Sequence, residues 1–229
     1  MSPSGLTEDA WLGERLGKPA WHLAADAAPS RIDVPTPAFI DARVPVADLA
    51  RPQALRAAGF TLVDTSLSFL RTGRVETAQF NADVGMGDPD DADHVARIAG
   101  ENFRTDRFHA DPEIDDRIAD RIKADWARNF FAGQRGEWMV VGRQNGQVSG
   151  FLQLLDRDGD VVIDLVAVNS AARNTGLARA MITFAAGTCN PGAPIRVGTQ
   201  LANTASIRLY ESLGFRFDSA SHIFHRHAR

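Results

Sequence analysis

Residues 166–178, VAVNSAARNTGLA, run from an apolar strand pattern through a loop of small and polar residues into a helix pattern. The loop and the first helical turn read Arg-x-x-Gly-x-Ala. Small residues let a diphosphate approach the backbone, where the free N–H groups of a first helical turn point at it and the helix dipole attracts it. The spacing differs from the G-x-G-x-x-G of dinucleotide folds. This stretch therefore predicts a diphosphate-binding loop, with a packing glycine at a helix start as the alternative.

A second motif follows in residues 198–215, GTQLANTASIRLYESLGF. Asn203 is a predicted helix cap, and Tyr210 lies seven residues later, two turns away on the same face. Both side chains are expected to point into one cleft at the end of the preceding strand. Tyr210 is the only tyrosine beside 13 phenylalanines, which favours a use for its hydroxyl, the alternative being a core tyrosine with one hydrogen bond.

The segments around these motifs predict a mixed sheet of the α+β or α/β class. The turns Asn145-Gly146 and Asp158-Gly159 separate three strands of a meander at residues 137–143, 147–155 and 161–168. Helices are expected over about residues 91–103, 175–186 and 204–213, and another begins after Asp111 as N-cap and Pro112. We expect a loop at residues 85–90, a strand at 195–200 and two short strands up to His227.

The N-terminal part of the chain predicts half a domain. An apolar strand at residues 38–43 precedes a helix at 48–58 and a strand at 60–70. We place the junction near residue 75, which gives a smaller partial α/β lobe at residues 1–74 and a second domain at residues 75–229. Phe69 and Arg71 follow the pair Gly59-Phe60. Phe224 and Arg226 follow the pair Gly214-Phe215 at the same spacing. This echo predicts a truncated duplication, unless Gly-Phe is only a common helix stop.

The composition is that of an ordinary folded protein of 229 residues, with 44% hydrophobic and 24% charged residues. A net charge of −4 and the lack of a basic block argue against a nucleic-acid partner. A single cysteine, Cys189, forms no internal disulfide. We expect a cytoplasmic protein without a membrane anchor, since no apolar run approaches the ~20 residues of a membrane span.

Taken together, the motifs resemble the GCN5-related N-acetyltransferase (GNAT) superfamily. Its pattern is V-x-V, then Q/R-x-x-G-x-G/A, a strand, N-x-x-A-x-x-x-Y and G-F, and the sequence matches it from Val166 to Phe215. The resemblance implies a GNAT fold, a mixed central β-sheet flanked by helices, preceded here by a partial GNAT-like lobe. Residues 103–133 and the first lobe look like the dTDP-4-amino-sugar acetyltransferases of the dTDP-fucosamine acetyltransferase type, which implies a nucleotide-linked amino sugar as substrate.

The resemblance also implies roles for individual residues. Acetyl-CoA is the expected cosubstrate, with its pantetheine arm along Val166, Ala167 and Val168 and near Asn203. Its pyrophosphate is expected on the N–H groups of Arg173, Asn174, Thr175, Gly176, Leu177 and Ala178. Tyr210 matches the general acid that protonates the leaving thiolate. Leu209 stands where the dTDP-fucosamine enzyme carries an arginine that helps to hold CoA, so that contact is in doubt.

The acceptor side is less defined by the sequence. Asp164 shares strand parity with Val166 and Val168, so it is the predicted general base, unless its carboxylate lies on a solvated face. His109 and Asp111, in the loop between the first two helices, are alternatives. Arg107 and His109 are the predicted substrate contacts, Arg107 toward a nucleotide diphosphate, with a surface salt bridge as the alternative.

These inferences predict an acetyl-CoA-dependent N-acetyltransferase that acts on an amino sugar, a dTDP-4-amino-4,6-dideoxyhexose. The alternatives are another small amine or a protein N-terminus as acceptor, or a domain that binds acyl-CoA without catalysis. No metal site is expected, because His222 does not share a strand face with His225 and His227. The sequence leaves open whether the chain forms a homodimer.

Overall fold

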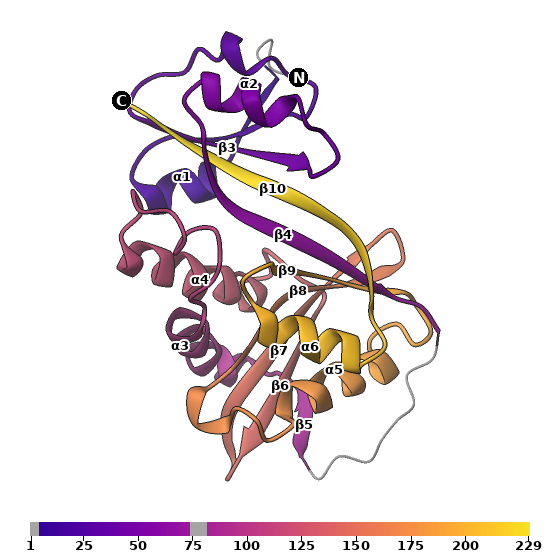
Figure 1. Ribbon diagram of the computed structural model, residues 1–229. Helices are drawn as coiled ribbons and strands as arrows, with labels where there is room; N and C mark the ends of the chain where they lie inside the picture. Colours follow the sequence, from indigo (N-terminus) through magenta and orange to yellow (C-terminus); the bar gives the residue numbers. More distant parts are fainter. Residues whose placement is uncertain (1–4, 74–81) are drawn as a thin grey trace.

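The computed structural model describes residues 5–73 and 82–229. Its strands form one ten-stranded sheet in the order β1-β2-β3-β10-β4-β9-β8-β7-β6-β5 (Figure 1). The strands are β1 (Leu6–Glu8), β2 (Ala20–Leu23), β3 (Ala38–Pro45), β4 (Thr61–Arg71), β5 (Asp83–Met86), β6 (Trp138–Gln144), β7 (Gln147–Arg157), β8 (Asp160–Val168), β9 (Ile195–Gln200) and β10 (Arg216–Ala228). The α-helices are α1 (Ala10–Leu16), α2 (Arg51–Ala57), α3 (Ala92–Asn102), α4 (Asp116–Phe131), α5 (Leu177–Thr188) and α6 (Thr204–Ser212). None of the helices in this part of the chain is long and apolar enough to cross a membrane.

The C-terminal half has the predicted meander with helices on both faces. β6, β7 and β8 pair antiparallel, and the residues that open their turns, Asn145 and Asp158, have φ angles of 52° and 55°. Apolar side chains of α5, β8 and β9 make one core, and those of α3, α4 and β7 make another on the opposite face. The mixed sheet flanked by helices is therefore confirmed.

Three predicted elements differ from the structure. Residues 85 and 86, where a loop was expected, belong to the edge strand β5, because residues 83–86 pair with the backbone of β6. α4 begins at Asp116 with Asp115 as its N-cap, so Asp111 is not the cap. β10 is one strand of 13 residues rather than two short ones, because it pairs with β3 along its second half and with β4 along most of its length.

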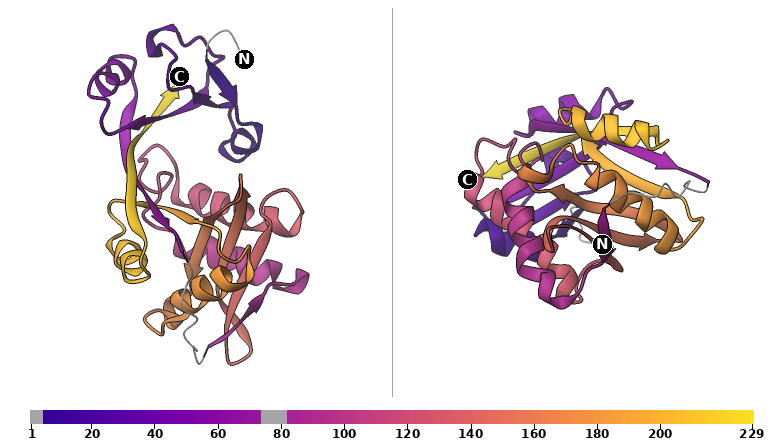
Figure 2. Two further views of the ribbon diagram at one scale, coloured as in Figure 1. Left: turned by 90° about the vertical axis from the view of Figure 1, so that its right-hand side faces the viewer. Right: turned by 90° about the horizontal axis from the view of Figure 1, so that it is seen from below.

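β4 and β10 are the structural link between the two parts of the molecule. They run together from the part that holds α5 and α6 to the part that holds α1 and α2 (Figure 2). The N-terminal lobe thus contains β1, β2 and β3 together with the second half of β10, over a core that packs against α2. The predicted junction near residue 75 lies outside the described residues, and the C-terminal strand extends into the N-terminal lobe.

The strand register agrees with the predicted duplication. β10 pairs with β3 at Ser221 and Pro45, and β4 pairs with β9 at Ser66 and Gln200. Pro45 and Gln200 are 155 positions apart, as are Ser66 and Ser221, which pair with each other in the middle of the β4–β10 ribbon. The register therefore relates β3-α2-β4 to β9-α6-β10 by the same offset as the Gly-Phe echo. This register is what the predicted duplication requires, and the duplication itself stays a prediction.

Candidate functional site

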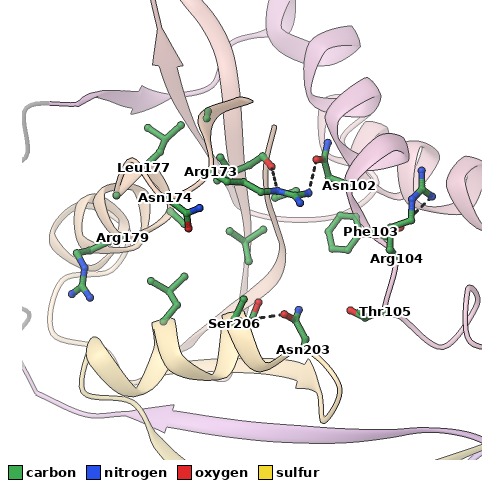
Figure 3. A pocket seen from close by; sticks show the side chains of 18 residues that line it. Asn102, Phe103, Arg104, Thr105, Arg173, Asn174, Leu177, Arg179, Asn203 and Ser206 are labelled. Carbon is green, nitrogen blue, oxygen red and sulfur yellow. Dashed lines mark hydrogen bonds between the residues drawn. The ribbon is translucent and has the colours of Figure 1, made fainter. Parts of the chain in front are cut away.

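A cavity opens where two parallel strands separate. β8 and β9 pair only from Val161 with Ile195 to Ile163 with Val197, so the second half of β8 has a free backbone edge on that side. A cavity of about 520 Å³ lies beyond this point, between the second half of β8, the start of α5, the start of α6 and the end of α3 (Figure 3).

Most of the predicted cofactor residues line this cavity. They are Val166, Ala167, Val168, Arg173, Asn174, Gly176, Leu177, Ala178 and Asn203. Thr175 is the exception, because its hydroxyl donates to the carbonyl of Ala172 at 2.8 Å and accepts from Gln144 Nε2 at 3.2 Å. Its backbone still belongs to the loop that precedes α5. Residues far apart in the sequence are thus brought to one site, whose role remains a prediction.

The loop before α5 leaves space for a ligand at the helix start. Asn174 and Gly176 have φ angles of 63° and 85°, a conformation that favours Asn and Gly. A Cβ atom added at Gly176 would meet no atom within 4 Å. The first N–H groups of α5 have no acceptor within the helix. Backbone donors, a favourable dipole and open space therefore coincide at this wall, which fits a diphosphate group.

Opposite this wall, α6 presents Asn203, Ser206 and Leu209 to the cavity. The Asn203 side chain accepts a hydrogen bond from the N–H of Ser206 at 3.2 Å, so the predicted N-cap is confirmed. Leu209 lines the cavity at the position where the dTDP-fucosamine enzyme carries an arginine, so it brings no positive charge there. Arg179 on α5 and Arg173 supply positive charge to the same cavity, and Arg173 donates to Asn102 Oδ1 at 2.8 Å.

Tyr210 lies behind the cavity wall, with only 2% of its surface exposed. Its ring packs against Phe69 and Phe215, with centroids 6.1 and 5.6 Å away. Burial raises the pKa of Tyr210 well above its ordinary value, and a hydrogen bond with the Ser206 side chain offsets part of this shift. The hydroxyl stays protonated near neutral pH and is separated from the cavity by Ser206, which itself lines it.

The fourth wall was not assigned from the sequence. It consists of Asn102, the last residue of α3, and of Phe103, Arg104 and Thr105, which follow the helix (Figure 3). The resemblance pointed to the loop between α3 and α4 but selected residues further along it. The signal that could have pointed to this wall is the end of α3 at Asn102, where the chain turns away from the helix.

Asp164 does not share a face with Val166, contrary to the predicted parity. In β8, Ile163 and Leu165 pair with the adjacent residues Leu154 and Gln153, so Asp164 is the extra residue of a β-bulge. The bulge reverses the alternation of side chains, which explains why Ile163 and Leu165 belong to opposite cores. The strand therefore carries Asp164 away from the cavity.

Donors surround the Asp164 carboxylate. Arg135 binds both of its oxygens at 2.6 Å, Trp126 Nε1 donates at 2.9 Å and Gln153 Nε2 at 3.2 Å. Protonation of Asp164 would weaken all of these contacts. This arrangement favours a structural anchor between α4 and β8 over the predicted role as general base.

The two predicted substrate contacts are also held by partners within the chain. The Arg107 guanidinium pairs with Asp41 of β3 and stacks on Phe108, and burial lowers the pKa of Arg107 to about 10. His109 lies between Asp106 and Asp120, at 2.5 and 3.0 Å. Although burial lowers it, these hydrogen bonds raise the pKa of His109 overall. Neither residue lines the cavity, so their predicted contacts with substrate have no support in this geometry.

The histidines of β10 make separate contacts. His225 Nδ1 and His227 Nε2 both lie close to Asp111 Oδ2, at 2.7 and 2.8 Å, whereas His222 Nδ1 lies 3.1 Å from the hydroxyl of Thr65. Across residues 5–73 and 82–229, no group of His, Cys, Asp and Glu side chains has the arrangement of a metal site.

The model of the Acetyltransferase (GNAT) family matches residues 99–215. Spore coat polysaccharide biosynthesis protein SpsD of Bacillus subtilis (strain 168) is 30% identical over 145 residues, which are 62% of this chain and 50% of that protein. The chain thus spans half the length of this curated relative.

Solved structures show the same fold over the whole chain. A GCN5-related N-acetyltransferase from Kribbella flavida aligns with a TM-score of 0.64 at 13% identity, covering 100% of this chain and 89% of the other. A functionally unknown conserved protein from Staphylococcus epidermidis ATCC 12228 aligns with a TM-score of 0.65 at 13% identity, covering 100% and 93%. These likenesses extend over the N-terminal lobe as well as the cavity.

Proposed function

Since the chain belongs to the acetyltransferase (GNAT) family, we propose that it transfers the acetyl group of acetyl-CoA to the amine of an amino sugar. The observation that carries this proposal is the cavity in which the free edge of β8, the N-terminus of α5 and the start of α6 converge. The polysaccharide-related name of the B. subtilis relative supports a sugar as acceptor. A dTDP-linked 4-amino-4,6-dideoxyhexose is the proposed substrate.

The residues at the cavity fit acetyl-CoA as substrate. The N–H groups at the start of α5 face the position proposed for its pyrophosphate, with Arg173 and Arg179 beside them. The free backbone edge of Val166 to Val168 pairs with the amides of the pantetheine arm. An N–H of this edge polarises the thioester carbonyl and stabilises the negative charge that develops on its oxygen.

Tyr210 is the proposed general acid. As the C–S bond breaks, its hydroxyl gives a proton to the departing sulfur, and the tyrosinate takes up the proton that the new amide nitrogen loses. Its raised pKa keeps the hydroxyl protonated until that moment. Ser206 lies between the hydroxyl and the cavity and must turn or pass the proton on, because Tyr210 itself does not line the cavity.

The proposed activity is tested by measuring free thiol release from acetyl-CoA with a panel of amines. The panel contains dTDP-4-amino sugars, plain hexosamines and peptides with a free N-terminus. Turnover confined to the nucleotide sugars is the expected result. Turnover on peptides or on plain hexosamines would overturn the proposed acceptor, and acetyl-CoA binding without turnover on any amine would overturn catalysis of this class.

The role of Tyr210 is tested by Tyr210→Phe, which keeps the ring that packs against Phe69 and Phe215. We expect kcat to fall by about 10²-fold, because general acid catalysis contributes about 10²–10⁴-fold. The Kd for acetyl-CoA, measured by calorimetry, is expected to change little. Unchanged turnover with the same melting temperature would assign Tyr210 to packing alone.

A further inference from the structure

Asp64 lies on β4 just beyond the end of its pairing with β9. The last residues in register are Ser66 and Gln200, and the carbonyl of Thr65 then accepts a hydrogen bond from the N–H of Leu201 at 2.8 Å. Asn203 follows two residues later and lines the cavity. β4 therefore brings Asp64 beside the chain segment that enters the α6 wall of the cavity, on the side of the N-terminal lobe.

The loop after α3 approaches Asp64 from the other direction. The charged groups near enough to act on Asp64 are Asp106 of that loop, Lys123 of α4 and Arg43 of β3. Asp106 directly follows Thr105, which lines the cavity. Asp64 does not itself line the cavity, but it lies beside the segment that enters the α6 wall and near the loop that continues the wall of residues 102–105.

The carboxylate of Asp64 is the one in this region that the protein leaves available. Within the described chain it accepts one hydrogen bond, from the N–H of Thr65 at 2.7 Å, and makes no ion pair. The neighbouring carboxylates Asp41, Asp106, Asp111 and Asp164 are each paired with an arginine, a lysine or a histidine. Lys123 is held by Asp106 at 3.6 Å and lies over the rings of Phe103, Phe108 and Trp126.

This environment gives Asp64 the properties of a base. Half-burial raises the pKa of Asp64 above its ordinary value, and Asp106 raises it further. The hydrogen bond from the N–H of Thr65 and the charges of Arg43 and Lys123 act against these shifts. A carboxylate with a raised pKa accepts a proton more readily. Asp164 and His109 are less able to accept a proton from a substrate, because Asp164 is bound by Arg135 and His109 by Asp106.

We propose that Asp64 is the general base that takes a proton from the ammonium group of the acceptor. This inference rests on the proposed acetyl transfer. Asp64 accepts one proton from the ammonium, which frees the lone pair of the nitrogen to form the C–N bond with the thioester carbon. The C–S bond then breaks, the sulfur gains its proton from Tyr210, and Asp64 later releases its proton to water. The N-terminal lobe thereby contributes a catalytic side chain to the cavity of the C-terminal domain.

The test compares the pH dependence of kcat/KM for wild type, Asp64→Asn and Asp33→Asn, with the amine that wild type acetylates. Asp33 is exposed, and its side chain makes no hydrogen bond or ion pair among the described residues, so Asp33→Asn removes a charge without touching the site. For Asp64→Asn we expect a loss of about 10²-fold at pH 7. The deficit should shrink toward pH 10, because the free amine then forms in solution without a base. Asp33→Asn should follow wild type throughout.

Different outcomes separate this inference from the proposed function. A deficit for Asp64→Asn that is the same at every pH would assign Asp64 to structure, and wild-type activity in this variant would remove it from the reaction. In either case wild-type turnover would leave the acetyl transfer intact. Wild-type protein that acetylates no amine would overturn the proposed function and the base together. Acetyl-CoA affinity and melting temperature, measured in parallel, should match wild type if Asp64 acts on the acceptor alone.

Discussion

At the scale of single residues, the most unusual environment is that of His225. Its ring is 1% exposed, lies edge-on to Phe39 and donates from Nδ1 to Asp111. Nε2 is buried without a partner in the described chain. A protonated ring would carry a charge with no acceptor at Nε2, so burial lowers the pKa of His225 to about 4. The neutral form thus belongs to the folded state.

This environment makes stability depend on pH. Between the unfolded pKa of about 6.5 and the folded pKa of about 4, the unfolded chain binds the additional proton, so the free energy of unfolding falls as the pH falls. We expect a loss of about 3 kcal/mol over this window, from about 1.4 kcal/mol per pKa unit.

His225→Asn keeps a donor near Nδ1 but cannot be protonated, so it should flatten this slope in urea unfolding at a series of pH values. His94→Asn, which changes an exposed histidine of α3, is the control and should keep the slope. A slope in His225→Asn equal to that of wild type would show that other groups cause it.

At the scale of elements, the sequence predicts what depends on local pattern. The meander, α5, α6 and the capping by Asn203 follow from turn residues, apolar spacing and a capping side chain, and all are confirmed. The bulge at Asp164 could not be predicted, because an extra residue in a strand leaves no local mark and reverses the parity on which the base assignment depended. The ion pair of Arg107 with Asp41 of β3 could not be predicted either, because the two residues are far apart in the sequence.

The start of α5 offers a test of the proposed diphosphate seat. Gly176 has positive φ and open space at its Cβ position, and both Asn and Asp tolerate this conformation. Gly176→Asp and Gly176→Asn are therefore matched in shape and differ in charge. We expect the Kd for acetyl-CoA to be at least about tenfold higher for Asp than for Asn, because the carboxylate repels the pyrophosphate. Equal Kd values in calorimetry would place the pyrophosphate elsewhere.

At the scale of the whole molecule, an ion pair and hydrogen bonds connect the two lobes. Arg107, from the loop after α3, reaches Asp41 on β3, and Asp111 from the same loop receives both histidines of β10. The side chains of Arg107 and Asp41 are 20% and 10% exposed, so each would leave a poorly solvated charge if the other were removed. These pairs fix the N-terminal lobe against the loop whose first residues line the cavity.

A double-mutant cycle separates this structural role from substrate binding. We expect Arg107→Gln and Asp41→Asn each to lower the free energy of unfolding by about 3 kcal/mol, as for a buried pair that loses one partner, and the double variant to lose little more. Urea unfolding measures all three. The acceptor KM should change little in any variant that remains folded. A raised acceptor KM with unchanged stability would instead make Arg107 a substrate contact.

The position of β10 between β3 and β4 also constrains the order of folding during synthesis. β3 and β4 are not neighbours in the sheet. β3 pairs with β2 and β4 pairs with β9 on one edge, and the other edge of each strand is paired only by residues 216–228. While the ribosome is still translating the C-terminal domain, the N-terminal lobe exposes strand edges that other nascent chains can bind. β10 therefore closes the N-terminal lobe only after the C-terminal domain has been translated, and until then one edge of β3 and one edge of β4 stay open.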